Sequence, residues 1–359
     1  MTDVTTDVVE GTPATRRTGL RISESFKTTL PLLAGIVLLG AYAAIKSPVF
    51  LTEQNLQNIL QQISVLGIIA MGMTFLMIAG LLDLSVGALA ALVGVVGAKL
   101  AVSGASPVVI VAACLAVGTL GSGVTGWIVA NARVSPFILT LGGMNVFLSL
   151  ALVLSDGTPV AVFDNPFSVL GLGSWFGLPA SGVVFLGIFV IALLFIRYSP
   201  LSRNAFAIGA NPQAAFLSGV PVGRVTIALF SLSGLLVGAA GIILLGRLGS
   251  GDANAGTGLE LQAIAAVVLG GAALNGGRGS IWGTFLGVVF LGEIANVLRV
   301  LGVQVFYQQL VYGGVLIIAV VVTALREDGR FPALRSLTSR VNGSHGPAVP
   351  HDEAPGGAR

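Results

Sequence analysis

Residues 225–246 read "VTIALFSLSGLLVGAAGIILLG", and this stretch decides the class of fold. It carries no charged side chain, and it is long enough for a helix that crosses a bilayer, which needs about 20 mainly apolar residues. The whole chain of 359 residues has the same character, since 55% of it is hydrophobic and 9% is charged. An ordinary globular domain carries about 25% charged residues. We therefore predict a polytopic membrane protein.

Apolar runs of this kind recur along the chain, and its 50 glycines would let the resulting helices approach closely. We predict an all-α protein with about ten spanning helices, or about eight if some of the shorter runs do not cross. The predicted segments are residues 30–45, 63–79, 84–102, 107–130, 137–155, 180–198, 225–246, 262–274, 281–298 and 307–325. The run 262–274 is short enough to form a half-helix or a broken helix.

The charges predict the topology of this bundle. If the N-terminus lies in the cytoplasm and the spans alternate, most of the 18 lysines and arginines fall on the cytoplasmic side. The exceptions are Lys46, Lys99, Arg247 and Arg299. We expect a cytoplasmic tail over 1–29 and a transmembrane domain over 30–326 with a cytoplasmic loop at 199–224. A disordered cytoplasmic tail over 327–359 completes the predicted organisation.

The sequence lacks the residues that several kinds of catalytic and metal-binding site require. The only cysteine, Cys114, lies in an apolar run, and both histidines, His345 and His351, lie in the polar C-terminal tail. The chain has no metal-ligand cluster, no catalytic Ser/His/Asp spacing and no phosphate-binding loop with its lysine. We therefore expect no enzyme activity, no metal, no cofactor and no nucleic-acid partner.

Two polar breaks interrupt the apolar runs, "GLLDLSVG" at 80–87 and "NGGRGS" at 275–280. Broken apolar segments in both halves of a chain are typical of transport sites. Asp83 and Ser85 in the first break have two interpretations, a helix-cap or loop role and the lining of a polar pathway. Asn275 in the second break is a candidate for the same pathway.

Polar residues also occur inside the predicted spans. Glu293, Asn296 and Arg299 recur on one helix face, where they either hydrogen-bond another helix or line a conduit. Asn145 needs a polar partner and is a further pathway candidate. Thr140 can bond the backbone carbonyl four residues back, so it needs no other role.

The loop "RNAFAIGANPQAAFLSGVPVGR", at 203–224, contains a short helix by its capping residues. Asn211 is a good N-cap, Pro212 suits the first helical position, and Gly219 suits the left-handed residue after the helix. A helix of about seven residues does not persist alone in water, so it must dock on something. The dock could be its own chain, the membrane surface or another protein.

Four motifs occur in order between about residues 55 and 325: "GLLDLSVGALAAL", "VSPFILTLGGMNVF" followed by "SDGTPV", "FAIGANPQAAFLSGVPVGR" and "GLELQAIAAVVLGGAALNGGRGSIWGT". In these motifs the chain resembles the permease subunit of ribose-type, monosaccharide ABC importers, within the branched-chain amino acid/ribose permease superfamily. Family members commonly read Gly-Gly-Ile-Asp-Leu-Ser where this chain has Gly80-Leu81-Leu82-Asp83-Leu84-Ser85. The departure is conservative and keeps Asp83, Ser85 and Gly87.

The resemblance implies a fold like that of the vitamin B12 type of importer and a set of partners. These are a second permease subunit (the same chain or a sister chain), cytoplasmic ABC ATPase subunits and an extracytoplasmic sugar-binding protein. It also implies that the loop carries a coupling helix that meets the ATPase. The implied coupling residues are Arg203, Ala207, Gly209, Asn211, Pro212, Ala214, Ala215, Phe216, Leu217 and Gly219.

We therefore expect a non-enzymatic permease in the bacterial plasma membrane, with both termini cytoplasmic, that passes a monosaccharide by alternating access. The translocation or polar-contact candidates are Asp83, Ser85, Asn145, Asn275, Glu293 and Asn296. One alternative keeps the machinery and changes the cargo to nucleosides, polyols or a signalling furanose. Others are an ion-coupled secondary transporter, which would need no ATPase, and a membrane-embedded enzyme or scaffold.

Overall fold

A computed structural model of the protein describes residues 24–132 and 134–304 and, between 307 and 321, all but 309, 316, 319 and 320. The helices are α1 Glu24–Lys46, α2 Glu53–Ile78, α3 Val86–Val102, α4 Pro107–Ala132, α5 Pro136–Leu154, α6 Ser168–Leu172, α7 Ala180–Tyr198, α8 Pro200–Ala210, α9 Pro212–Leu217, α10 Val222–Leu248, α11 Leu259–Leu269 and α12 Ile281–Val300. The strands are β1 Val160–Ala161, β2 Ser174–Trp175, β3 Leu178–Pro179 and β4 Ser250–Gly251. The described residues from 307 to 321 are helical. The tail at 327–359 lies outside the described residues.

The prediction of an all-α membrane protein is confirmed. Among the described residues, 6 helices are long and apolar enough to cross a bilayer: α2, α4, α5, α7, α10 and α12. Shorter apolar helices are residues Leu30–Lys46 of α1, α3 and α11. The total of about ten spans stays a prediction.

Two helices extend beyond the apolar segments predicted to span the membrane. Helix α2 begins at Glu53 rather than at residue 63. Thr52 caps it by accepting a hydrogen bond from the Asn55 amide at 3.4 Å. Helix α1 begins at Glu24, inside the region predicted as a polar tail.

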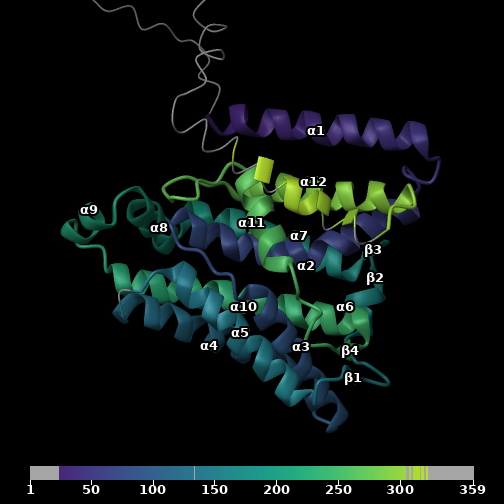
Figure 1. Ribbon diagram of the computed structural model, residues 1–359, viewed down its shortest axis with the longest axis horizontal. Coiled ribbons are helices and arrows are strands. Elements are labelled where there is room, and N and C mark those ends of the chain that lie inside the picture. The colour runs from purple at the N-terminus through teal and green to yellow at the C-terminus, as the bar shows by residue number, and fades with distance from the viewer. Residues whose placement is uncertain are drawn as a thin grey trace, which may run out of the picture.

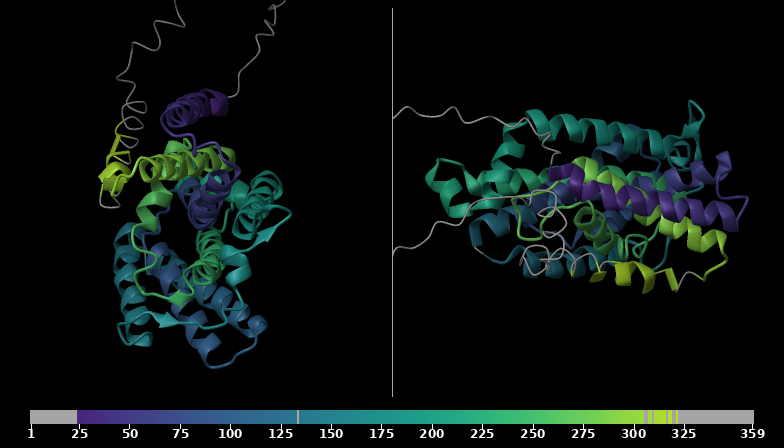
Figure 2. Two further views of the ribbon diagram at one scale, coloured as in Figure 1. Left: turned by 90° about the vertical axis from the view of Figure 1, so that its right-hand side faces the viewer. Right: turned by 90° about the horizontal axis from the view of Figure 1, so that it is seen from above.

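The long helices run side by side, α11 lies among them, and the other short elements lie at the two ends of the bundle (Figures 1 and 2). Helices α8 and α9 project at one end, which we call the α8–α9 end. At the opposite end, the strand end, β1 pairs with β4, and β2 with β3, each antiparallel. Helix α6 also lies at the strand end, beside the last turn of α10.

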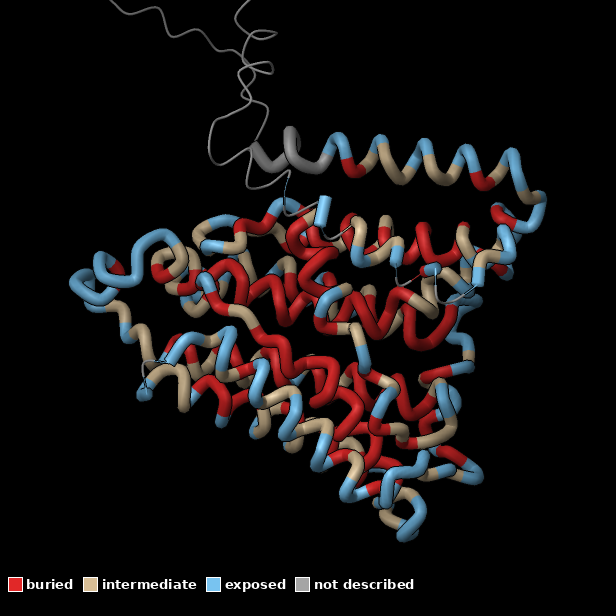
Figure 3. The backbone as a smooth tube through the Cα atoms, in the orientation of Figure 1, coloured by how far each residue is buried: buried red, intermediate tan, exposed pale blue. Residues whose placement is uncertain are grey.

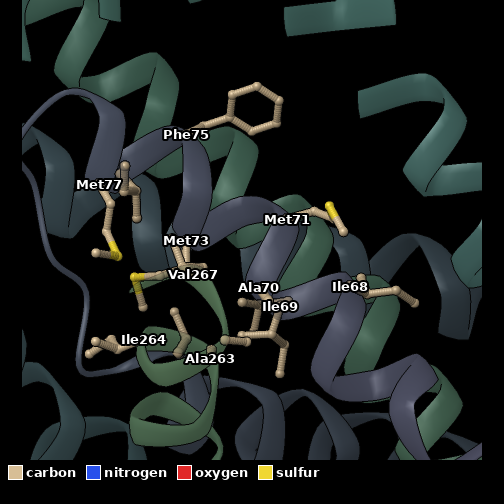
Figure 4. Close-up of a cluster of buried hydrophobic side chains, with 14 of the residues drawn as sticks. Ile68, Ile69, Ala70, Met71, Met73, Phe75, Met77, Ala263, Ile264 and Val267 are labelled. Carbon is tan, nitrogen blue, oxygen red and sulfur yellow. The ribbon is translucent and has the colours of Figure 1, made fainter. Parts of the chain in front are cut away.

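Helix α2 forms the centre of the bundle, and its residues from Ile63 to Ile78 are buried (Figure 3). In Figure 4, Ile69 and Met73 of α2 lie near Ala263 and Val267 of α11. Helix α1 lies outside this core and packs on α12. The other helices therefore fold around α2 as the most deeply buried span.

Helices α4 and α10 approach each other through glycines. A Cβ atom on Gly118 would overlap the Gly234 carbonyl oxygen, and one on Gly234 would overlap the Gly118 carbonyl oxygen. One turn along, a Cβ atom on Gly238 would lie 2.9 Å from the carbonyl oxygen of Cys114. Small residues at such spacing are how spanning helices obtain contact area without a hydrophobic driving force. The two helices therefore touch backbone to backbone.

Helices α3 and α11 begin inside the bundle. The non-helical segment between α10 and α11 runs along α3, with Gly251 against Val95 and Ala98 and Gly256 against Gly87. Irregular backbone at membrane depth persists only where protein buries it or where it lines a cavity. The predicted half-helix at 262–274 corresponds to α11, Leu259–Leu269. Its N-cap residue is Gly258, with φ 85°.

Replacing Gly118 or Gly234 with alanine is expected to destabilise the protein, because each Cβ would push α4 and α10 apart. The cost of such overpacking is about 1–3 kcal/mol. The measurement is the melting temperature of the detergent-purified protein. The matched control is Gly187→Ala in α7, where a Cβ atom meets nothing within 4 Å.

At position 187 alanine should raise stability, since it is the better helix former by about 1 kcal/mol. Equal behaviour of all three variants would contradict the backbone contact between α4 and α10.

Candidate functional site

The α8–α9 projection contains the predicted docking helix. Asn211 caps α9 as predicted, since its Oδ1 accepts hydrogen bonds from the Gln213 and Ala214 amides, each at 3.0 Å. Pro212 begins the helix, which has 6 residues, and Gly219 follows it with φ 84°. The predicted short helix is therefore confirmed.

One face of α9 offers apolar side chains to solvent. Phe216 is 69% exposed and Leu217 is 84% exposed, whereas Ala215 is buried. Arg203 is exposed, and its Nη1 donates to the Tyr198 carbonyl at 3.4 Å. In the described part of the chain nothing covers Phe216 or Leu217, so the helix presents a small apolar surface outside the bundle.

Helix α8 is an element that sequence reasoning missed, although the sequence carries its start signal. Ser199 caps it by accepting from the Leu201 amide at 3.1 Å, and Pro200 takes the first helical position. Its buried residues Ala205 and Ile208 attach it to the bundle. A serine followed by proline is a helix-start pattern that could have revealed it.

The end of α8 meets both polar breaks at a junction of glycines, Gly80, Gly209, Gly276 and Gly277. A Cβ atom on Gly209 would overlap the Ile78 carbonyl oxygen and the Gly277 amide nitrogen. The Gly277 amide donates to that same Ile78 carbonyl at 2.8 Å. A Cβ atom on Gly276 would lie 2.7 Å from the Gly80 amide nitrogen and 2.9 Å from Gly209 Cα. The projection, the end of α2 and the segment before α12 are therefore in backbone contact.

Asp83 is fully buried and links the first break to α4. Its Oδ1 accepts from the Ser85 amide at 2.9 Å and from the Ser85 hydroxyl at 2.5 Å. Its Oδ2 accepts from the Ser122 hydroxyl at 3.2 Å. The carboxylate bonds the loop and α4, and it does not cap α3, whose N-cap residue is Ser85. The described contacts are those of the predicted loop role.

Asn296 joins α12 to α2 by a reciprocal amide pair. Its Nδ2 donates to Asn55 Oδ1 at 2.8 Å, and Asn55 Nδ2 donates to Asn296 Oδ1 at 2.9 Å. Glu293 is buried beside Gly40 of α1, and its Oε2 has no hydrogen-bond partner among the described residues. Arg299, the third residue of the predicted stripe, is exposed. Of the three residues of the predicted stripe, Asn296 is therefore the one that forms a hydrogen bond to another helix.

The six predicted pathway residues do not gather in one place within the chain. Asn145 is exposed on α5 and donates to the Leu141 carbonyl of its own helix at 3.1 Å. Asn275 is exposed at the α8–α9 end. Thr140 bonds the Phe137 carbonyl, three residues back rather than the predicted four. Of the six, only Asp83 and Ser85 hydrogen-bond each other, and Glu293 and Asn296 share one face of α12.

The buried spans, the broken helices and the projecting end define a polytopic membrane protein with the form of a transport permease. Residues 55–320 match the family described as branched-chain amino acid transport system / permease component. The chain belongs to this family, and its predicted resemblance to monosaccharide ABC importer permeases is confirmed.

Three relatives illustrate the match. The ribose import permease protein RbsC of Bacillus subtilis is 42% identical over 288 residues, 80% of this chain and 89% of the relative. The L-arabinose ABC transporter permease protein AraH of Azospirillum brasilense is 37% identical, over 83% of this chain and 89% of the relative. The D-allose transport system permease protein AlsC of Escherichia coli is 35% identical, over 80% and 89%. No solved structure matches the chain.

Replacing Gly209 with alanine is expected to open the glycine junction, because the new methyl group would overlap the backbone at Ile78 and Gly277. Backbone amides of α9 and of residues 276–279 should then exchange hydrogen at least several-fold faster. Hydrogen–deuterium exchange of the purified protein measures this. The control is Gly223→Ala at the same end, where the nearest atom is the Ala130 Cβ at 3.7 Å. Unchanged exchange in Gly209→Ala would contradict a tight junction.

Proposed function

We propose that this chain is the transmembrane permease subunit of an ATP-driven importer and that it passes a monosaccharide by alternating access. The observation that carries the proposal is the exposed apolar surface of α9, at the end of a chain that belongs to this permease family. Relatives named for ribose, L-arabinose and D-allose support a pentose or hexose as cargo. ATP is hydrolysed on separate subunits, and the permease itself needs no cofactor.

In this proposal the α8–α9 end faces the cytoplasm. Arg203, Arg224 and Arg278 lie at this end, in keeping with the excess of basic residues in cytoplasmic loops. The strand end then faces outward, with the exposed ion pair of Lys99 Nζ and Asp156 Oδ2 at 3.3 Å. Both termini are cytoplasmic, and the membrane is the bacterial plasma membrane.

The proposed assembly pairs this chain with a second permease subunit, which is another copy or a sister chain. ABC ATPase subunits dock on α9 from the cytoplasm, and an extracytoplasmic binding protein delivers the sugar. The complete fold would be that of the vitamin B12 type of importer, with about ten spans.

Nine of the ten proposed coupling residues have a local role in forming or presenting α9, and Arg203 contributes to the basic charge of this end. Phe216 and Leu217 are the apolar contacts that the ATPase covers. Asn211, Pro212 and Gly219 fix the start and end of α9. Gly209 lets the junction close, and small residues keep the turn between the two helices compact: Ala207, Ala214 and Ala215. Movement of the ATPase would thus reach α2 and α12 through backbone contact.

Uptake by the assembled importer tests the function. The permease is reconstituted in proteoliposomes with the ATPase and the binding protein encoded beside it, and uptake of labelled ribose, L-arabinose and D-allose is measured. Uptake of at least one sugar should require ATP and should persist when ionophores remove ion gradients. Uptake driven by an ion gradient without ATP would support a secondary transporter and overturn the proposal.

The docking role of α9 has its own test, the double substitution Phe216→Asp with Leu217→Asp. Two charges on this surface should reduce co-purification of the ATPase at least tenfold, because apolar contact is replaced by unpaired carboxylates. The inserted amount of permease should not change, since both side chains are exposed. The control is Gln213→Asp with Ser218→Asp, which adds the same charge at polar positions of the same segment. Normal ATPase binding in the first variant would exclude this surface as the dock.

A further inference from the structure

A cavity of about 330 Å³ lies between α2, α10, α11 and α12, toward the strand end. It shares Gln262, Leu291 and Tyr312 with an adjoining hollow of about 310 Å³. Sites for small ligands occupy about 300–1,000 Å³ and combine apolar walls with a few polar groups. The size therefore suits one small solute.

The wall of this cavity has the chemistry that a sugar requires. Gln62 and Gln262 each present an amide that both donates and accepts hydrogen bonds, Arg247 supplies donors, and Asp252 supplies acceptors. Leu66 and Leu291 are among the apolar residues between them. Sugar hydroxyls donate and accept, while the C–H groups of the ring need apolar contact. The charged groups around the cavity are Arg247 and Asp252 in its wall, Glu260 in the adjoining hollow and Arg299 beside Arg247. Two groups of each sign suit a neutral ligand better than a phosphorylated or acidic sugar.

Gln62 is the residue of the cavity wall that has a buried polar atom without a partner among the described residues. Its Oε1 atom is buried and has no hydrogen-bond partner in the described part of the chain. A buried acceptor without a donor is costly, and such atoms are rare in native structures. The neighbouring Gln61, in contrast, donates from its Nε2 to the Gly171 carbonyl at 2.5 Å. This oxygen is covered by protein atoms, so a rotation of the Gln62 amide toward the cavity would be needed before a hydroxyl there could donate to it.

The backbone around the cavity is also of the kind found at transport sites. Asp252 and Ala255 come from the non-helical segment between α10 and α11, and Gln262 comes from the first turns of α11. Broken helices at membrane depth form the substrate sites of many transporters. At their other ends, α2 and the segment before α12 meet α8 in the glycine junction. Two of the helices that line the cavity, α2 and α10, therefore also contact α8.

We infer that this cavity binds the neutral monosaccharide during its passage, with Gln62 and Gln262 as hydrogen-bonding and specificity-determining residues. The inference rests on the proposed function and adds the place where the permease holds the sugar. Sequence reasoning missed these residues, because glutamines near the ends of apolar runs resemble ordinary interfacial residues.

Uptake kinetics of the assembled importer test the inference with the substitutions Gln62→Leu and Gln262→Leu. Each substitution replaces the amide with an apolar group of similar size. The KM for the sugar that the wild type transports best should then rise about tenfold, which is the effect of one lost hydrogen bond to a buried partner. ATPase co-purification should stay at the wild-type level. The matched control is Gln54→Leu, an exposed glutamine of α2 outside the cavity wall, which should leave KM unchanged.

Thiol labelling gives a second readout that does not depend on transport. The chain has one native cysteine, Cys114, which is buried. In Gln262→Cys, the transported sugar should slow labelling by a membrane-impermeant thiol reagent several-fold. Ser103→Cys, at an exposed position after α3, is the control and should be labelled at the same rate with and without sugar.

Three outcomes separate the inference from the proposed function. Failure of the wild type to take up any of the three sugars with ATP overturns both. Wild-type uptake, together with unchanged KM in both leucine variants and labelling of Gln262→Cys that sugar does not slow, overturns the cavity alone. Raised KM with sugar-protected labelling supports both.

Discussion

The close approach of backbones at glycines is the constraint on which the rest of the structure depends. In a bilayer, helices gain no hydrophobic energy by leaving lipid for one another, so their contact must come from packing and hydrogen bonds. Gly118, Gly234 and Gly238 supply that packing between α4 and α10. The same device recurs where Gly87 meets Gly256 and where Gly209 meets Ile78 and Gly277. These close backbone contacts hold the bundle together, position the broken helices and attach the projecting end to the bundle.

Polar groups inside the bundle have two different roles. The bonds from Asp83 to Ser85 and Ser122 are internal, as is the Asn55–Asn296 pair, and each leaves its polar groups bonded within the protein. Gln62 and Glu293 differ, since each has a buried oxygen without a partner among the described residues, and of these two residues only Gln62 lies in the cavity wall. Satisfied polar groups hold helices together, whereas a polar side chain in a cavity wall that bonds nothing within the chain keeps its hydrogen-bonding capacity for a ligand. This difference separates the scaffold from the inferred sugar site.

The geometry connects the two sites that the proposed transport cycle needs. The docking surface of α9 and the cavity lie toward opposite ends of the bundle, and α2 extends from one to the other. Helix α8 touches the end of α2 without intervening side chains, because only glycine fits there. A backbone contact of this kind allows little relative movement of α8 and α2. A displacement of α9 would therefore be transmitted to α2, which lines the cavity.

The sequence by itself determined that this protein lies in a lipid bilayer, and it determined the approximate position of each described span and the short helix at 212–217. These depend on local properties, since hydropathy over ~20 residues and capping chemistry need no knowledge of neighbours. The tertiary structure alone decided where the polar residues went. Asp83 accepts a hydrogen bond from Ser122 of α4, Asn296 pairs with Asn55 of α2, and Gln62 lies in a cavity wall with residues from α10, α11 and α12. A buried polar group takes whichever partner the packing brings near it, and that partner can lie far away in the chain.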